Sequence, residues 1–199
     1  MFTGIIETLG QIKEVKTYGT NKTFWIQSPL SPEFKVDQSV AHNGVCLTVE
    51  EVLEDWHRVT AVQETLDKTT LNQWVTGSSI NIERSLLPSS RLDGHFVQGH
   101  VDTTGRCENI QNQDGSWVFT FSFPQNFAPL VIEKGSISLN GTSLTVFDVG
   151  SNTFSVAIIP YTFEHTTMQN LKVDDLVNLE FDMVGKYIMR NLSLEKKLN

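Results

Sequence analysis

Cysteine, proline and basic side chains are scarce in this 199-residue chain, and the first and last of these scarcities each exclude a class of protein. The two cysteines, Cys46 and Cys107, are too few for a disulfide framework, and their spacing is not that of a cysteine-rich zinc site. The 15 Lys and Arg against 23 Asp and Glu leave a formal net charge of −8, which argues against binding of nucleic acid. No apolar run approaches the length that spans a bilayer, so we expect no membrane association.

Cofactor motifs and an export signal are also missing. The sequence has neither a P-loop nor a glycine-rich dinucleotide motif, and no Cys, His and carboxylate cluster has metal-ligand spacing. We therefore expect no cofactor, neither ATP, nicotinamide nor metal. The first residues lack a basic region and reach an acid at Glu7, which predicts no signal or transit peptide, a cytoplasmic location and two reduced thiols.

What the sequence does contain is an internal repeat. Residues 39–49 align with residues 136–146 at an offset of 97, and six of the eleven positions are identical. The same offset relates two further pairs of segments, 65–70 with 162–167 and 80–83 with 177–180. One offset that holds over three separated windows indicates a duplication.

The duplication divides the chain into halves that both have the pattern of β domains. We expect domains at 1–95 and 96–186, followed by a C-terminal helix and tail at 187–199. Runs rich in β-branched and aromatic residues, bounded by Gly, Pro, Asn and Ser, predict strands that include 11–15, 23–26, 59–62 and 79–82. The predicted fold class is therefore all-β, with two small antiparallel barrels.

We expect turns and a few short helices to connect these strands. Asn43-Gly44 and Asn140-Gly141 separate strand-like runs and predict tight hairpin turns. We expect short helices at 64–71, at 161–168 and at 127–134. The tail at 184–194 places apolar residues on one stripe and predicts an amphipathic helix that either covers its own domain or contacts another subunit.

Strand parity after the first turn separates core residues from candidate ligand contacts. The odd positions from 45 to 49 are apolar and predict the core, so Cys46 and Thr48 point to the opposite face. In the copy, Ser143 and Thr145 take these places. Small polar groups repeated in both halves suit a ligand pocket, although a solvated barrel exterior would have the same pattern.

The two copies also differ, and the differences concern chemistry. Cys46 corresponds to Ser143, and His100 corresponds to Ile5 at an offset of 95. If residues 99–102 form a strand, His100 and Asp102 share a face and His95 lies on the other, which argues against a two-histidine metal site. Two similar pockets with unequal reactive groups suit a pair of like molecules, one a donor and the other an acceptor.

Four motifs, in the correct order and over nearly the full chain, resemble those of the α-type riboflavin synthase family. They are Met-Phe-Thr-Gly-Ile at 1–5, Asn-Gly-Val-Cys-Leu-Thr-Val at 43–49, Gly-His-Phe-Val-Gln-Gly-His-Val-Asp at 94–102 and Asn-Gly-Thr-Ser-Leu-Thr-Val at 140–146. The resemblance implies two six-stranded Greek-key β-barrels with short helices, and a C-terminal α-helix that packs in a homotrimer. It also implies the last step of riboflavin biosynthesis, in which two molecules of 6,7-dimethyl-8-ribityllumazine dismutate to riboflavin and 5-amino-6-ribitylaminouracil.

The same resemblance assigns site residues. The family's catalytic set falls on Ser39, Cys46, His100, Thr145 and Asp182. Its substrate contacts fall on Gly4, Ile5, Ile6, Cys46, Leu47, Thr48, Thr60, Ala61, Val62, Gln63, Glu64, Thr65, Gly99, His100, Val101, Lys134, Ser143, Leu144, Thr145, Ala157, Ile158, Ile159, Pro160, Tyr161 and Thr162. In the family the working site lies between the N-terminal barrel of one subunit and the C-terminal barrel of a neighbour. Lumazine synthase, which makes the substrate, is a candidate partner.

The residue types fit this chemistry while leaving the roles open. A histidine such as His100 suits removal of a proton from the acidic C7 methyl group of the lumazine. Cys46, or a water assisted by Ser39, is the candidate nucleophile, and Asp182 and Thr145 are candidates for proton relay or charge stabilisation. The alternatives are a non-catalytic lumazine or flavin antenna, carrier or sensor, which would not need this set together. An enzyme should bind two ligands per chain and an antenna one.

Overall fold

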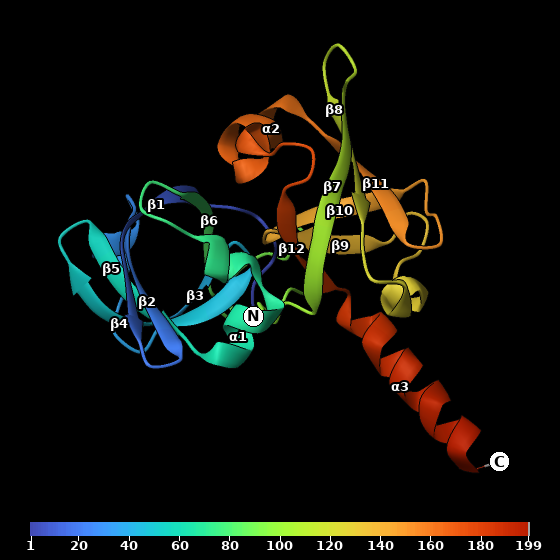
Figure 1. The fold of residues 1–199 in the computed structure, drawn as a ribbon, viewed down its shortest axis with the longest axis horizontal. Helices are drawn as coiled ribbons and strands as arrows, with labels where there is room; N and C mark the ends of the chain where they lie inside the picture. Colours follow the sequence, from blue (N-terminus) through green and yellow to red (C-terminus); the bar gives the residue numbers. More distant parts are fainter. Residues whose placement is uncertain (199) are drawn as a thin grey trace.

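The computed structural model describes residues 1–198 and contains two closed six-stranded antiparallel barrels (Figure 1). The first barrel has the strand order β1-β2-β5-β4-β3-β6, and the second has the corresponding order β7-β8-β11-β10-β9-β12. The strands are β1 (Thr8–Tyr18), β2 (Asn21–Gln27), β3 (Ser39–His42), β4 (Val45–Leu53), β5 (Trp56–Ala61), β6 (Ser79–Arg84), β7 (Thr103–Asn112), β8 (Trp117–Ser122), β9 (Ser136–Leu139), β10 (Thr142–Phe147), β11 (Thr153–Ile158) and β12 (Leu176–Phe181). The all-β prediction is confirmed.

Short helices interrupt both barrels at matching places. They are the 3-10 helices η1 (Ser31–Glu33), η2 (Thr70–Gln73), η3 (Gln125–Leu130) and η4 (Thr167–Asn170), and the α-helices α1 (Gln63–Lys68) and α2 (Pro160–His165). Each of the first two predicted helices breaks into an α-helix and a 3-10 helix. The break occurs because Thr69 and Thr166 are extended and their hydroxyls accept hydrogen bonds from the N–H groups two residues on, at 3.3 Å.

The third predicted helix, at 127–134, is wrong in both position and type. The chain forms η3 instead, which contains Pro129 and ends before Val131. Lys134 has a left-handed backbone with φ of 63° and donates its N–H to the Val146 carbonyl at 2.9 Å, so this stretch leads into β9. Apolar spacing alone did not reveal that the proline and the following turn stop a helix here.

Both predicted Asn-Gly turns are confirmed, and they meet at the junction of the barrels. All four residues have positive φ, 46° and 77° at Asn43-Gly44 and 46° and 82° at Asn140-Gly141. A Cβ atom on Gly44 would lie 2.6 Å from the backbone nitrogen of Gly141, so glycine is required at this approach. Across the junction, Asn81 Nδ2 donates to the Asn140 carbonyl at 2.8 Å and Asn178 Nδ2 to the Asn43 carbonyl at 2.9 Å.

Each barrel encloses its own apolar core. In β4 the odd positions Val45, Leu47 and Val49 are buried, whereas Cys46 is half-buried and Thr48 is exposed. This alternation confirms the predicted parity and turns the small polar side chains away from the barrel interior.

The C-terminal helix α3 (Met183–Leu198) projects away from the second barrel (Figure 1). It begins four residues before the predicted boundary at 187, and residue 199 lies outside the described part of the chain. Its first turn lies close to η3, since a Cβ atom on Gly185 would lie 3.4 Å from Leu130. The apolar side chains Val184, Tyr187 and Ile188 are exposed, so the stripe does not cover its own barrel.

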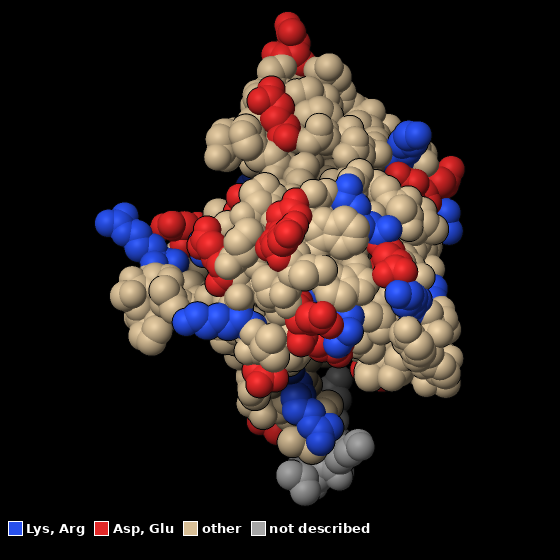
Figure 2. Space-filling model, turned by 90° about the vertical axis from the view of Figure 1, so that its left-hand side faces the viewer, with Lys and Arg blue, Asp and Glu red and all other residues tan. Residues whose placement is uncertain are grey.

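The surface charge is mixed. Figure 2 shows acidic and basic side chains interspersed over the face it presents. Among the described helices, none is long and apolar enough to cross a membrane.

Candidate functional site

Two segments join the barrels and bring the residues of the two halves together. We name them the N-terminal segment (residues 2–6) and the connecting segment (residues 97–101). They pair with each other through Phe2 and Val97, whose N–H groups and carbonyls exchange hydrogen bonds of 2.7 and 3.1 Å. Each segment then runs along a strand of the other half of the chain.

A glycine in each segment allows the segment to lie close to the strand of the other half. The Gly99 carbonyl accepts a hydrogen bond from the Cys46 N–H at 2.8 Å, and the Gly4 carbonyl accepts one from the Ser143 N–H at 2.8 Å. Both glycines have positive φ, 80° and 78°, and a Cβ atom on either would lie 2.6 Å from the Cβ atom of the residue it faces. The fold therefore creates two related half-sites, one at Cys46 and one at Ser143.

The connecting segment forms one side of a cleft at Cys46 with a volume of about 590 Å³. Its lining consists of Val45, Cys46, Glu64, Thr65, Lys68, Thr69, Gly99, His100, Val101, Asp102, Phe127 and Lys186. Six of these, Cys46, Glu64, Thr65, Gly99, His100 and Val101, are among the predicted substrate contacts. The cleft thus combines a half-buried thiol, an exposed imidazole and the start of α1 within one chain.

His100 and Asp102 reach the cleft from an irregular segment, because β7 begins only at Thr103. The expectation that residues 99–102 form a strand is therefore wrong, although both side chains do line the same cleft. Asp102 is fixed by the Phe181 N–H at 2.9 Å and by an ion pair with Lys186 at 2.6 Å.

Two ion pairs balance the charge along the cleft. Lys68 pairs with Glu64 at 2.6 Å, one turn apart on α1, and Lys186 of α3 pairs with Asp102. Each lysine therefore stands beside a carboxylate, and the cleft has no excess charge from these four groups. Such a lining suits a polar, uncharged ligand more than a strongly anionic one.

The half-site at Ser143 carries a histidine that sequence reasoning left out of the site. His95 is buried, and its Nδ1 lies 2.7 Å from the Ser143 hydroxyl. Burial lowers the pKa of His95, and the nearby negative charge of Asp182 opposes this shift. His95 and His100 lie in different half-sites, but strand parity does not explain this, because the segment is not a strand. Nothing in the spacing indicated that His95 would meet Ser143.

The predicted catalytic set is divided between the half-sites. Cys46 and His100 share the cleft, whereas Ser39, Thr145 and Asp182 are not part of its described lining. Ser39 lies opposite Thr48 in the β3–β4 pair, and Thr145 lies opposite the corresponding serine of β9. Asp182 precedes α3 and accepts a hydrogen bond from the N–H two residues on, at 3.0 Å.

Several predicted substrate contacts lie elsewhere in the chain. Leu47, Ala61 and Ile158 are buried in the barrel cores, so their side chains do not face a ligand site on the surface. Lys134 is exposed, with its ammonium group 5.6 Å from the centre of the Phe147 ring. Within the described residues, no three Cys, His, Asp or Glu side chains are grouped as a metal site.

Comparison with known families gives a consistent assignment. A family model described as the lumazine binding domain matches the chain twice, at residues 3–85 and 98–182. The chain is 39% identical to a riboflavin synthase of Brucella abortus over 98% of this chain and 100% of that protein. It is 40% identical to a riboflavin synthase of Schizosaccharomyces pombe, over 94% of this chain and 91% of that protein.

Solved structures share the same fold at lower sequence identity. The crystal structure of LumP complexed with riboflavin superimposes with a TM-score of 0.85 at 20% identity, covering 91% of this chain and 99% of that one. LumP complexed with 6,7-dimethyl-8-(1'-D-ribityl)lumazine gives a TM-score of 0.83 at 18% identity, with the same coverage. These structures establish the duplicated barrel independently of the closer sequence relatives.

Proposed function

Because this chain belongs to the riboflavin synthase family, we propose that it converts two molecules of 6,7-dimethyl-8-ribityllumazine into riboflavin and 5-amino-6-ribitylaminouracil. This would make it a transferase that moves a four-carbon unit between two identical substrates, in the last step of riboflavin biosynthesis. The observation that carries the proposal is the meeting of Cys46 and His100 in one cleft, while the second half-site repeats at Ser143 the backbone hydrogen bond that Cys46 makes.

The two residues of the cleft supply complementary chemistry. The His100 imidazole would remove a proton from the C7 methyl group of one lumazine, whose carbanion is delocalised into the ring. The Cys46 thiolate would add to the other lumazine and activate it as the acceptor. Ser39, Thr145 and Asp182 remain proposed as groups that relay protons or stabilise developing charge.

The exposed stripe of α3 supports a contact between subunits, and we propose a homotrimer because the family resemblance implies one. The apolar side chains Val184, Tyr187 and Ile188 of the stripe are exposed in the single chain, and a subunit contact would remove them from water. In such an assembly the cleft of one subunit would face the C-terminal half-site of a neighbour, which would place Thr145 beside Cys46. Light scattering should then give three times the chain mass of 22.4 kDa.

We propose the domain division 1–95, 96–186 and 187–199, a cytoplasmic location, and lumazine synthase as a candidate partner. The two lumazine-binding matches support the first division, and the two unbonded thiols are compatible with a reducing compartment.

The test is turnover of the purified chain with 6,7-dimethyl-8-ribityllumazine alone. We expect riboflavin absorbance and fluorescence to rise, with one riboflavin formed for every two lumazines consumed. His100→Gln is the control variant, and it should bind lumazine with greatly reduced turnover. Tight binding of one lumazine per chain without turnover in the wild type would instead identify an antenna or carrier.

A further inference from the structure

Glu180 of β12 is a buried carboxylate that binds the connecting segment. Its side chain is 3% exposed. One oxygen accepts the Gln98 N–H at 2.7 Å, and the other accepts the N–H groups of Gly99 and His100, both at 2.9 Å. Three consecutive backbone donors therefore converge on one carboxylate, which fixes the path of the segment.

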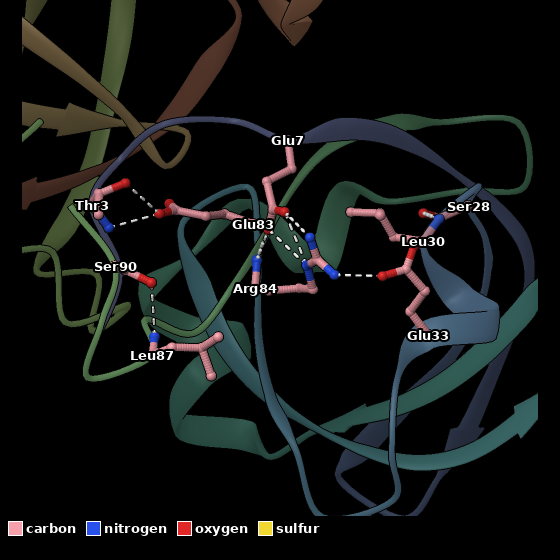
Figure 3. A network of polar contacts seen from close by, with 9 residues as sticks. All are labelled: Thr3, Glu7, Ser28, Leu30, Glu33, Glu83, Arg84, Leu87 and Ser90. Carbon is pink, nitrogen blue, oxygen red and sulfur yellow. Dashed lines mark hydrogen bonds and ion pairs between the residues drawn. The ribbon is translucent and has the colours of Figure 1, made fainter. Parts of the chain in front are cut away.

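The first barrel holds the corresponding residue, Glu83 of β6. It is 4% exposed, and one of its oxygens accepts the Thr3 N–H at 2.6 Å and the Thr3 hydroxyl at 2.8 Å (Figure 3). Its other oxygen accepts the Gly4 N–H at 3.0 Å. The Ile5 N–H is not bound by this carboxylate but donates to the Thr3 hydroxyl at 3.2 Å.

The backbone donors of the two carboxylates therefore differ at one position. Glu180 accepts the N–H of His100, the residue with the reactive side chain. Glu83 accepts the N–H of Gly4 but not that of Ile5, which corresponds to His100. Within the described residues, no side chain hydrogen-bonds the His100 imidazole, so its direction depends on its backbone. Both carboxylates are buried, and burial raises the pKa of each.

We propose that Glu180 is a positioning residue for the reaction, because its carboxylate fixes the backbone of His100 so that the imidazole faces the cleft beside Cys46. The inference rests on the proposed function. It assigns to Glu180 a role that Glu83 lacks, although both residues hold a segment between the barrels.

Glu180→Gln tests this role, with Glu83→Gln as the matched control. An amide retains the shape but replaces an acceptor oxygen by a donor that faces N–H groups. We expect both variants to lose thermal stability by similar amounts. Glu180→Gln should lower kcat by about 10- to 100-fold with little change in KM, because a displaced imidazole reacts more slowly. Glu83→Gln should alter KM more than kcat, since Ile5 has no proton to transfer.

A second measurement follows the imidazole itself. The chain has 5 histidines, and the NMR signal of His100 can be assigned by its loss in His100→Gln. This signal should shift in Glu180→Gln and stay unchanged in Glu83→Gln. In a His100→Gln background, Glu180→Gln should cause almost no further loss of turnover.

The outcomes separate the inference from the proposed function. Equal losses of kcat in both glutamine variants, or an unshifted His100 signal in Glu180→Gln, would assign Glu180 a purely structural role. If Glu180→Gln does not fold, Glu180→Asp keeps the buried charge, shortens its reach and is expected to shift the same signal. If the wild type makes no riboflavin, the proposed function fails, and the NMR comparison still decides whether Glu180 positions His100.

Discussion

Three positions that are fully buried in the first barrel hold polar side chains there and apolar side chains in the second barrel. In the first barrel, His57 Nδ1 lies 2.7 Å from the Ser31 hydroxyl, and its Nε2 lies 2.8 Å from Nε2 of His42. All three side chains have no exposed surface. At the offset of 97, the second barrel has Ala128, Leu139 and Phe154 instead. Its core contains several phenylalanine rings in contact, such as the stacked pair Phe119 and Phe121.

The same barrel fold therefore accommodates either buried histidines or apolar side chains at these positions. The stability of the two interiors should respond differently to pH. Only one proton fits between the facing Nε2 atoms of His42 and His57, so the two rings cannot both be cationic. Burial lowers the pKa of His57 to about 4 and lowers that of His42 as well, with a further contribution from the neighbouring ring. The hydrocarbon interior of the second barrel has no such dependence.

The largest expected effect is therefore acid lability of the first barrel. An unfolded histidine takes up a proton near pH 6.5, whereas folded His57 does so only near pH 4. The contribution of His57 to the free energy of unfolding is fully present above pH 6.5. It decreases as pH falls, and about 3 kcal/mol is lost below pH 4. Urea unfolding at pH 7, 5 and 4 measures this loss.

A matched triple variant replaces these three polar side chains of the first barrel by the residues at the corresponding positions of the second. In Ser31→Ala combined with His42→Leu and His57→Phe, the free energy of unfolding should decrease less between pH 7 and 4 than in the wild type. All other titrating groups are common to both proteins, so they cancel in the difference. A difference between the two proteins that stays constant with pH would contradict the prediction.

The half-sites provide the second comparison, between Cys46 and Ser143. Cys46→Ala should lower turnover by about 100-fold, equivalent to about 2.7 kcal/mol in the activation free energy, if the thiol is the nucleophile. Ser143→Ala removes one hydrogen bond to His95 and should lower turnover by about tenfold or less. Steady-state kinetics with lumazine measures both, and near-normal turnover in Cys46→Ala would exclude the thiol as the nucleophile.

The outward direction of Cys46, the Asn-Gly turns and the duplication could all be predicted, because they follow from local periodicity and from identities at one offset. The path of the connecting segment could not be predicted, since its hydrogen bond from Cys46 to Gly99 joins residues far apart in the chain. For the same reason the partnership of His95 with Ser143 was missed. The buried pair of His42 and His57 was not predicted either, because the contact joins two different strands of the barrel.

The smallest expected difference between the halves concerns the junction, where they are equivalent. Asn81 Oδ1 accepts the Thr167 N–H and Asn178 Oδ1 accepts the Thr70 N–H, both at 2.8 Å, and each amide nitrogen donates to a carbonyl of the opposite half. Asn81→Ala and Asn178→Ala would each leave a buried donor and acceptor unpaired. Each should lower the free energy of unfolding by about 2 kcal/mol. Urea unfolding at pH 7 should give equal losses, because the junction is symmetric although the cores and half-sites are not. A clearly larger loss for one asparagine would show that the halves also diverge where they meet.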